Sequence, residues 1–471
     1  MDRDRKTEIR DRFDRLAGER EAWQRRNRYY YDDQRRYVRF LVPEGLRVLE
    51  VGCGLGDLLA SLKPARGLGL DLSEAMVKEA SRRHPSLEFR VADVETLELD
   101  ETFDVIILAD LVGHLLDVET AFRRLRQCCT SRTRIIVSSS SHLWEPVFSL
   151  AERLRLKMPQ QLQNWLTPGD LANLLHLADF EIVKTERRLL LPKWIPFVST
   201  LANRVLAFLP GFRLACLSQY VVARPLGLDR VRERSVSVVI PCRNERGNIE
   251  AAVRRLPVFG SSQEIIFVEG HSTDGTAQEI ERVRLAYPNR HIRVLFQEGK
   301  GKGDAVRTGF AQATGDVLMV LDADLTVRPE DLPRFYQAIV SGKGEFINGC
   351  RLVYPMEQEA MRALNLIGNK FFSLAFSWLL NQRIKDTLCG TKVLLREDYA
   401  RIEQNRGYFG EFDPFGDFDL LFGASKQNLK IVEVPIRYQE RKYGETNIRR
   451  FAHGWLLLKM TIYGFFRLKA V

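Results

Sequence analysis

The stretch that most constrains this chain is an apolar run that ends in two acids. Residues 317–321 read Val-Leu-Met-Val-Leu, and Asp322 and Asp324 follow with one alanine between them. An unbroken apolar run predicts a strand covered on both faces, as in a parallel sheet, whose ligands bind beyond the carboxyl ends of the strands. Two carboxylates this close favour a hard divalent cation, Mg²⁺ or Mn²⁺. The alternative is an acidic turn that only ends the strand.

Length and charge limit the number of domains and the kinds of partner that the chain can have. The chain has 471 residues, which predicts two or three domains. Its formal charge of +10 favours anionic partners such as nucleotides or phospholipid surfaces. Residues 1–44 alternate basic and acidic side chains, so we expect a solvated helical extension and no nucleic-acid partner. The sequence shows no secretory signal and no apolar run of about 18 residues. We therefore expect a cytoplasmic protein, with peripheral attachment to the inner face of the cytoplasmic membrane left open.

A glycine turn follows the first predicted strand. Residues 46–51 form that strand, and Gly52, Gly54 and Gly56 come before a helical pattern. Such a turn lets a ligand lie against bare backbone. Asp71 ends the next predicted strand, where an acid can bind both hydroxyls of a ribose. A dinucleotide and S-adenosylmethionine compete for a nucleoside site of this kind, and the glycine spacing departs from the GxGxxG of a dinucleotide site.

The spacing of these glycines resembles motif I of class I S-adenosylmethionine-dependent methyltransferases. Ala92-Asp93-Val94 and the strand at 103–110, followed by His114, continue a resemblance that covers residues 45–225. It implies a Rossmann-like α/β domain. No pattern names the methyl acceptor, and a cofactor-binding module without catalysis stays open as the alternative. The cofactor site that the resemblance implies consists of Glu50, Gly52, Gly54, Gly56, Asp71, Asp93 and Asp110.

A second α/β pattern begins after a predicted linker at residues 226–234. Its first buried strand is stopped by Pro241, and its second strand ends in Glu269, which can receive a base edge or a ribose. Residues 299–307 form a glycine-rich basic loop that opens a helix and contains Lys302. This loop can cradle a phosphate, although it lacks the frame of an NTPase loop.

The order of these motifs resembles a family 2 glycosyltransferase of the GT-A fold over residues 235–447. The family's first nucleotide-binding strand matches residues 240–245, and its second acidic motif matches residues 268–276. The family's common double acid is Glu269 and Gly270 here, so one carboxylate is missing. The resemblance implies a nucleotide-diphospho-sugar donor and a Mg²⁺ or Mn²⁺ ion on Asp322 and Asp324. The implied donor contacts are Pro241, Asn244, Glu245, Glu269, Asp274, Lys302, Asp322, Arg441 and Lys442.

Downstream motifs resemble the dolichyl-phosphate mannose synthase and polyprenyl-phosphate glycosyltransferase branch. In that branch Arg351, Asp386 and Lys392 would lie at the lipid-phosphate acceptor. A phosphate acceptor is already an anion, whereas a glycan hydroxyl needs a carboxylate to take its proton. Asp417 resembles the base of hydroxyl-using relatives, so both acceptors stay open, with the phosphate favoured. Direct displacement would invert the anomeric centre, and the catalytic candidates are Asp324, Asp417 and Arg351.

Two apolar segments raise the question of a membrane. Residues 448–471 predict an amphipathic helix with aromatic anchors and basic flanks, which suits a membrane interface, with packing on its own domain as the alternative. Apolar stretches within residues 189–216 are too short and interrupted to span a bilayer; they would pack on a partner or lie at its surface. The whole sequence predicts two α/β domains, a methyltransferase fold followed by a GT-A fold.

Overall fold

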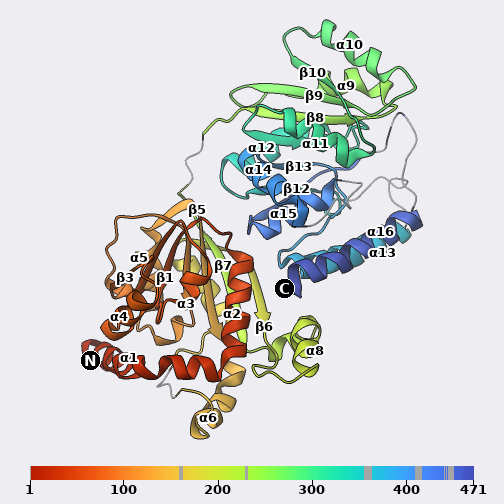
Figure 1. The fold of residues 1–471 in the computed structure, drawn as a ribbon. Helices are drawn as coiled ribbons and strands as arrows, with labels where there is room; N and C mark the ends of the chain where they lie inside the picture. Colours follow the sequence, from red (N-terminus) through yellow and green to blue (C-terminus); the bar gives the residue numbers. More distant parts are fainter. Residues whose placement is uncertain are drawn as a thin grey trace. The chain divides into compact units, whose positions relative to one another are not determined.

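The chain divides into two compact units, each built around a seven-stranded sheet (Figure 1). In this computed structural model, unit 1 is Met1–Leu228 with Lys469–Val471, and unit 2 is Asp229–Leu468. The structure describes residues 2–158, 163–228, 232–354, 363–408, 416–439, 441, 443 and 450–470.

The sheet of unit 1 has the order β3-β2-β1-β4-β5-β7-β6, in which β7 runs antiparallel to β5 and β6. The strand order reverses between β1 and β4, so a crevice forms at the carboxyl ends of these central strands. The glycine turn and Asp71 both lie at that edge. The strands are β1 (Arg47–Val51), β2 (Arg66–Asp71), β3 (Glu88–Val91), β4 (Phe103–Ala109), β5 (Cys129–Ser140), β6 (Phe180–Arg188) and β7 (Ser218–Pro225).

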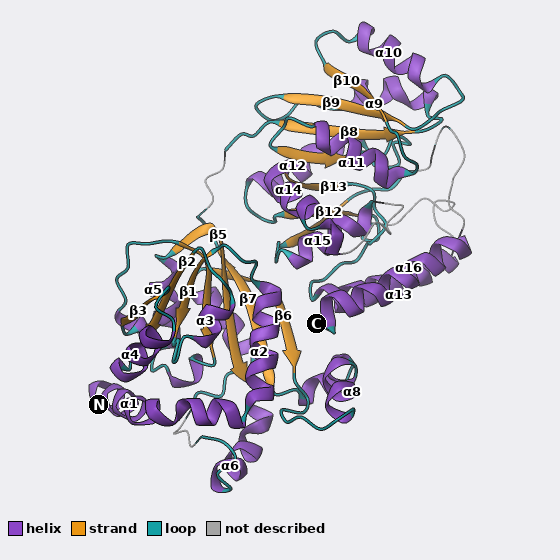
Figure 2. Ribbon diagram, viewed as in Figure 1, coloured by secondary structure: helices purple, strands orange, loops and turns teal. Residues whose placement is uncertain are grey.

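Helices lie on both sides of this sheet (Figure 2). Thr167 begins α7 with a capping box, in which its hydroxyl accepts from the backbone of Asp170 and the Asp170 carboxylate accepts in return. The residues before the sheet form two helices rather than one. The helices of unit 1 are α1 (Asp2–Arg26), α2 (Arg28–Leu41), α3 (Asp57–Ser61), α4 (Glu74–Arg83), α5 (Val118–Arg126), α6 (Glu145–Arg153), α7 (Pro168–Leu177) and α8 (Val198–Arg204).

The sheet of unit 2 has the order β10-β9-β8-β11-β13-β12-β14, and only β13 runs antiparallel to its neighbours. The apolar run at 317–321 is buried throughout, as predicted. Pro241 does not stop its strand: β8 continues through it to Cys242. The strands are β8 (Val236–Cys242), β9 (Gln263–Glu269), β10 (His291–Phe296), β11 (Val317–Val320), β12 (Phe346–Cys350), β13 (Lys392–Leu395) and β14 (Ile431–Pro435).

The predicted C-terminal helix forms as α16 (Arg450–Gly464), and it packs against the long helix α13 (Ala363–Leu380). Trp378 of α13 stacks on Phe465, which directly follows α16. On α16 itself, Leu457 and Met460 are buried, whereas Trp455 is 60% exposed. In the described part of the chain no helix is both long and apolar enough to cross a bilayer. The helices are α9 (Ile249–Arg255), α10 (Thr276–Ala286), α11 (Lys302–Gln312), α12 (Leu332–Val340), α13 (Ala363–Leu380), α14 (Arg396–Gln404), α15 (Asp417–Lys426) and α16 (Arg450–Gly464).

Candidate functional sites

The glycine turn after β1 forms one wall of a large cavity in unit 1. Gly52 and Gly54 have φ angles of 74° and 53°, in the left-handed region that favours glycine. The Gly54 N–H donates to the Asp71 carboxylate at 2.8 Å. A Cβ on Gly52 would lie 2.8 Å from Leu111, whereas a Cβ on Gly54 would meet no atom within 4 Å. The backbone at Gly54 is therefore open to a ligand.

The third glycine of the turn has a different role. Gly56 is left-handed as well, with a φ of 77°, but it does not line the cavity. A Cβ on Gly56 would lie 2.6 Å from the Phe89 ring. Close packing of the turn on β3 therefore accounts for this glycine without a bound cofactor.

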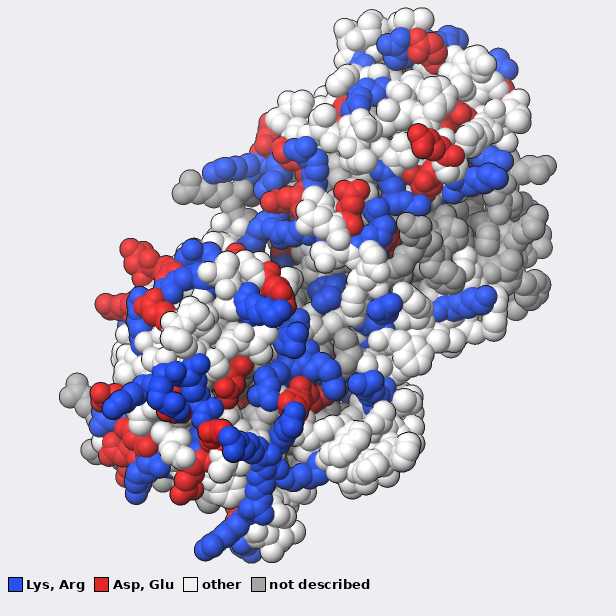
Figure 3. All heavy atoms as spheres, viewed as in Figure 1, with Lys and Arg blue, Asp and Glu red and all other residues white. Residues whose placement is uncertain are grey.

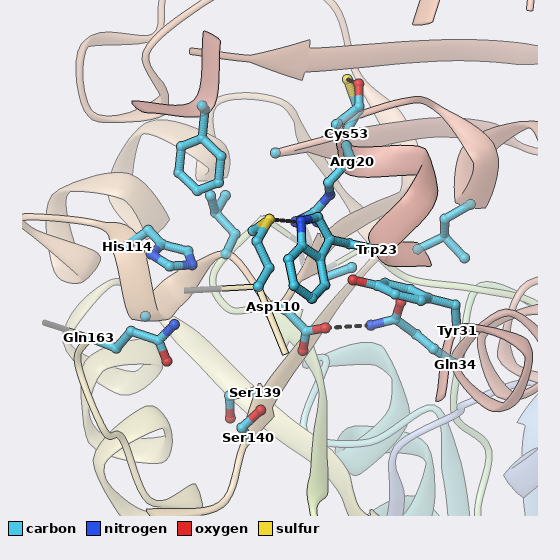
Figure 4. A pocket seen from close by; sticks show the side chains of 18 of the residues that line it. Arg20, Trp23, Tyr31, Gln34, Cys53, Asp110, His114, Ser139, Ser140 and Gln163 are labelled. Atoms are coloured by element: carbon cyan, nitrogen blue, oxygen red, sulfur yellow. Dashed lines mark hydrogen bonds between the residues drawn. The ribbon is translucent and has the colours of Figure 1, made fainter. Parts of the chain in front are cut away.

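The cavity has a volume of about 440 Å³ and brings most of the predicted cofactor residues together. Figure 4 shows one of them, Asp110, beside Gln34 in the lining. It extends from the carboxyl ends of β1, β2 and β4 to helices α1, α2 and α6. A nucleoside with an amino-acid tail fits a pocket of this size and mixed polarity. The predicted residues that line it are Glu50, Gly52, Gly54, Asp71, Asp93 and Asp110.

Two acids at the floor of the cavity are held by backbone N–H groups. Glu50 is buried and accepts from the N–H of Leu59 at 3.0 Å. Burial raises the pKa of Glu50 to about 8. Asp71 accepts from the N–H groups of Gly54 and Ser73, yet burial still raises its pKa above the ordinary value. A bound hydroxyl could therefore find a fixed acceptor here.

The other two predicted acids contact the N-terminal helices. Lys6 on α1 forms ion pairs with Asp93 and Glu95. Asp110, after β4, accepts from the Tyr30 hydroxyl at 2.5 Å and from Gln34 Nε2 at 2.8 Å, both on α2. These contacts place α1 and α2 over the cofactor residues, and not in solvent as the charge pattern predicted.

Several cavity residues were missed in the sequence. Arg20 and Trp23 line the cavity from α1, and Arg20 Nη1 lies 3.7 Å from the Met158 sulfur. A tryptophan inside a highly charged helix was the available signal. His114, which was named from the sequence, lies in the cavity wall with its ring edge-on to Phe13. Desolvation together with the nearby arginines and lysine lowers the pKa of His114 to about 4. The imidazole is therefore neutral at pH 7.

In unit 2, the first acid after β11 faces a lysine from the glycine-rich loop. Lys302 Nζ lies 2.6 Å from Asp322 Oδ1. Burial would raise the pKa of Asp322, but the Lys302 ammonium outweighs it and the pKa lies below the ordinary value. A Cβ on Gly390 would lie 2.0 Å from Asp322 Oδ2 and 2.2 Å from Lys302 Nζ. Only glycine fits beside this ion pair.

The second acid faces an arginine. Asp324 accepts from the N–H and the hydroxyl of Thr326, and its other oxygen lies 3.0 Å from Arg441 Nη2. The same arginine nitrogen lies 3.2 Å from Glu245. Arg441 thus joins Asp324, a predicted metal ligand, to Glu245 in the turn after β8. The predicted donor residue Lys442 lies outside the described residues.

The turns after β8 and β9 hold each other in place. Asn244 has a φ of 56°, and its side-chain oxygen accepts from the N–H of Thr273 at 2.8 Å. Glu269 accepts from the N–H groups of His271 and Ser272, so its carboxylate is used by its own turn. Asp274 accepts from the N–H and the hydroxyl of Thr276, the first residue of α10. Burial would raise the pKa of Asp274, but hydrogen bonds from Thr276 and the Arg246 backbone outweigh this and lower it.

The predicted acceptor residues form a buried ion pair. Arg351 Nε and Nη2 donate to the two oxygens of Asp386 at 2.7 and 2.8 Å, and the Arg351 N–H donates to the same carboxylate. Burial would raise the pKa of Asp386, but the arginine outweighs it and lowers the pKa. The guanidinium also lies 5.2 Å from the centre of the Tyr438 ring. These contacts fix the orientation of Arg351.

Lys392 and Asp417 form a second buried pair. Lys392 is fully buried, donates to the Cys389 carbonyl, and lies 3.5 Å from Asp417 Oδ1. Asp417 begins α15, and a Cβ on the preceding Gly416 would lie 2.7 Å from the Gly303 Cα. This close approach brings α15 to the glycine-rich loop and groups Asp417 with Lys302.

The donor atoms present suit a divalent cation only with help from a ligand. Among the described residues, no group of three or more acidic, histidine or cysteine side chains could hold a metal. Asp322 and Asp324 supply two carboxylates, and Mg²⁺ is often held by one or two carboxylates plus substrate phosphates. The residues therefore fit a metal that arrives with a diphosphate.

Comparisons with known proteins agree with a transferase made of two enzyme domains. Residues 1–185 match the family model of a methyltransferase domain, and residues 237–402 match that of glycosyl transferase family 2. The chain thus joins a methyltransferase domain, with a Rossmann-like fold, to a family 2 glycosyltransferase domain with a GT-A fold.

Curated relatives match the second domain. A dolichol-phosphate mannosyltransferase of Pyrococcus furiosus is 32% identical over 220 residues, which cover 45% of this chain and 59% of that protein. A low-salt glycan biosynthesis hexosyltransferase of Haloferax volcanii is 28% identical over 229 residues, which cover 47% of this chain and 51% of that protein. The chain thus spans little more than half the length of these relatives.

Solved structures resemble each unit. A magnesium protoporphyrin IX methyltransferase from Synechocystis with bound SAH (S-adenosylhomocysteine) is 20% identical, with a TM-score of 0.35 and coverage of 47% of this chain and 99% of that one. Glucosyl-3-phosphoglycerate synthase from Mycobacterium tuberculosis, in complex with Mn²⁺, UDP and phosphoglyceric acid, is 20% identical, with a TM-score of 0.38 and coverage of 50% and 78%.

Proposed function

We propose that unit 2 transfers a hexosyl group from a nucleotide-diphospho-sugar to a polyprenyl-phosphate-type acceptor, with inversion at the anomeric carbon. The observation that carries this proposal is the set of acid–cation pairs at the carboxyl ends of its strands: Lys302 with Asp322, and Arg441 with Asp324. A diphosphate needs cations that can move onto it and release it again. Such pairs supply cations without leaving a lone buried charge before the donor binds.

A divalent metal belongs to the proposed reaction. Asp324, with Asp322, would hold Mg²⁺ or Mn²⁺ against the donor diphosphate, and the ion would neutralise charge as the nucleoside diphosphate leaves. Lys302 and Arg441 would then exchange their carboxylate partners for phosphate oxygens. Asn244 and Glu269 keep the two nucleotide-binding turns in register for the base and ribose.

The second part of the proposal concerns the chemical class of the acceptor. A polyprenyl phosphate attacks as an anion, so it requires cations and no base. The hydrogen bonds to Asp386 use Nε and Nη2 of Arg351. In the proposal, Nη1 of Arg351 meets the acceptor phosphate. The similarity to a protein called a dolichol-phosphate mannosyltransferase supports this acceptor class.

A glycan hydroxyl with Asp417 as base is the second candidate. Its support is the position of Asp417 at the start of α15, close to Lys302. The ion pair of Asp417 with the buried Lys392 favours a structural role instead. In that role Asp417 balances the charge of a lysine that has no access to solvent.

For unit 1 we propose S-adenosylmethionine-dependent methylation, carried by the cavity that gathers Glu50, Gly54 and Asp71. Bound S-adenosylmethionine would supply an activated methyl group, with Asp71 on its ribose and Asp93 beside its adenine. A domain that binds the cofactor without catalysis is the alternative. We place the protein in the cytoplasm, at the inner face of the membrane that contains a polyprenyl phosphate.

The acceptor experiment offers the purified chain a polyprenyl phosphate and a free glycan, each with UDP- and GDP-hexoses and Mn²⁺. We expect transfer to the lipid phosphate, retained within about threefold in Asp417→Asn, because a phosphate needs no base. Asp419→Asn is the matched control. Asp419 lies in the same helical turn as Asp417, but its carboxylate pairs with Arg406. Transfer to the glycan alone, lost in Asp417→Asn and kept in Asp419→Asn, would contradict the phosphate acceptor.

A further inference from the structure

Unit 1 exposes a large apolar surface around α8. Phe197 is 89% exposed, and Trp194, Val198 and Leu201 are each more than half exposed. The chain continues over η4 (Leu206–Phe208) and η5 (Phe212–Ala215), where Leu214 is 59% exposed. Single exposed hydrophobic residues are ordinary, but a contiguous patch of this kind marks an interaction site. We call residues 194–214 the apolar face.

Within the segment that carries the apolar face, the charged residues have one sign. From residue 187 to residue 228 the sequence contains no aspartate or glutamate, but it contains six basic residues, of which Lys193 and Arg204 are exposed. Figure 3 shows an uncharged area at the position that α8 has in Figure 1. A protein partner would commonly match a mixture of charges, whereas an anionic lipid surface matches apolar and basic groups without acids.

Helix α6 extends this surface. Val147 and Leu150 lie on α6, and Leu143 and Leu154 lie next to its two ends. The four residues recur at intervals of four, three and four, as on one side of a helix, and all are about half exposed. The Trp144 indole N–H, at the start of α6, donates to the Ala215 carbonyl of η5 at 2.9 Å. This hydrogen bond joins the α6 stripe to the apolar face.

The same helix forms a wall of the cofactor cavity. Trp144, Phe148 and Ala151 line the cavity, and so do Val147 and Lys193, which also belong to the exposed surface or border it. The cavity is therefore bounded by the surface elements that carry the apolar stripe. A molecule whose tail lay along the apolar face could place its polar end in the cavity.

We propose that unit 1 docks on an anionic bilayer through the apolar face and the α6 stripe, and that its methyl acceptor is the polar end of an amphiphile held in that bilayer. The acceptor part rests on the proposed methyltransferase function, whereas the docking part stands without it. In the transfer, a lone pair of an acceptor oxygen or nitrogen forms the bond to the methyl carbon. The electrons of the broken C–S bond stay on sulfur, which gives SAH, and the acceptor proton passes to water.

Vesicle binding of the full chain tests the docking part. The probe is sucrose-loaded vesicles of phosphatidylglycerol and phosphatidylcholine in equal parts, sedimented at low and high salt. In the double variant Phe197→Asp with Leu201→Asp, the partition coefficient should fall about tenfold or more, because interfacial binding scales with buried apolar area. The matched control is Val258→Asp with Leu285→Asp, two residues of unit 2 that are 76% and 70% exposed. It should bind within about twofold of the unchanged chain, because it carries the same added charge.

Equal vesicle binding by the two double variants would overturn the docking proposal. So would a chain that fails to bind vesicles but dimerises in sedimentation equilibrium through Phe197 and Leu201, since the face would then be an interface between copies. SAH titration by calorimetry checks that unit 1 remains folded in both variants, and cooperative thermal unfolding checks unit 2. If no form of the chain binds SAH, the methyltransferase function fails, and the vesicle result still decides the docking part.

Methyl transfer tests the acceptor part. Labelled S-adenosylmethionine is incubated with the chain and vesicles that contain the glycosylated polyprenyl phosphate, with a water-soluble nucleotide-sugar as the competing acceptor. We expect the label in the organic phase, reduced about tenfold by Phe197→Asp with Leu201→Asp through loss of docking. Label in the nucleotide-sugar alone, unaffected by this double variant, would overturn a bilayer-held acceptor.

Discussion

The two units hold their buried acids in different ways. In unit 1, Glu50 and Asp71 accept hydrogen bonds from backbone N–H groups, and burial raises the pKa of both. In unit 2, Asp322 and Asp386 face Lys302 and Arg351, and these cations lower the pKa values despite burial. In the first arrangement backbone N–H groups hold the acids, and in the second arrangement side-chain cations hold them.

This difference separates two kinds of ligand chemistry. A backbone N–H has a fixed position, so the acids of unit 1 present a rigid set of acceptors that suits the hydroxyls of a nucleoside. A lysine or arginine side chain can change partner, so in the proposed function the pairs of unit 2 would open and bind an anionic diphosphate. Substitutions in the two units test this contrast.

The largest effect is expected at the metal motif. Asp324→Asn should lower kcat/KM for hexosyl transfer about a thousandfold, the scale of losing one electrostatic stabiliser of developing charge. Initial rates with varied Mn²⁺ would measure it. Asp316→Asn is the control, because Asp316 bonds to Ser235 at the other end of β11. Unchanged metal dependence in Asp324→Asn would remove Asp324 from the metal site.

A smaller effect is expected for the ribose acid of unit 1. Asp71→Ala should weaken SAH binding about a hundredfold, because hydrogen bonds to a charged group contribute about 1.5–3 kcal/mol each. Isothermal calorimetry would measure it, with the exposed Asp100→Ala as control. If SAH bound equally to both variants, the fixed-acceptor account of unit 1 would fail.

The smallest effect concerns pH. The folded-state pKa of Glu50 is raised from 4.5 to about 8, so the folded protein keeps a proton that the unfolded chain has lost. The contribution of Glu50 to stability is therefore full below about pH 4.5 and is lost as pH rises towards 8. Between pH 6.0 and 7.5, unit 1 should lose about 2 kcal/mol relative to Glu50→Gln, at 1.36 kcal/mol per unit.

Calorimetric unfolding would show this loss as a shift of the transition that SAH stabilises. The comparison is the difference between the unchanged chain and Glu50→Gln, because other groups titrate equally in both. Parallel pH profiles for the two proteins would mean that Glu50 is already ionised in the folded state.

The sequence predicted the fold well because the decisive signals are local. The apolar run at 317–321 predicts a buried strand, and its first four residues form the buried strand β11. The capping box that fixes the start of α7 lies within four residues of sequence, from Thr167 to Asp170. The glycine turn after β1 requires left-handed backbone, which few residues other than glycine adopt.

Side-chain partners were less predictable because they depend on distant parts of the chain. The periodicity of α1 does not tell which surface the helix covers, so Arg20 and Trp23 were missed. Lys392 and Asp417 were assigned to rival acceptors, yet they contact each other across 25 positions of sequence. Gly56 matched a cofactor motif, although its contact with Phe89 explains it.

Pro241 determines where the pairing between strands β8 and β11 ends. The Val239 carbonyl accepts from the N–H of Leu321, so residue 239 faces β11, and residue 241 faces the same way because strand orientation alternates. Proline has no N–H to offer there. Pairing between β8 and β11 therefore stops beside Leu321, and the chain that follows is released from the sheet. A missing hydrogen-bond donor thus frees Asp322 and Asp324 to leave the sheet and pair with Lys302 and Arg441.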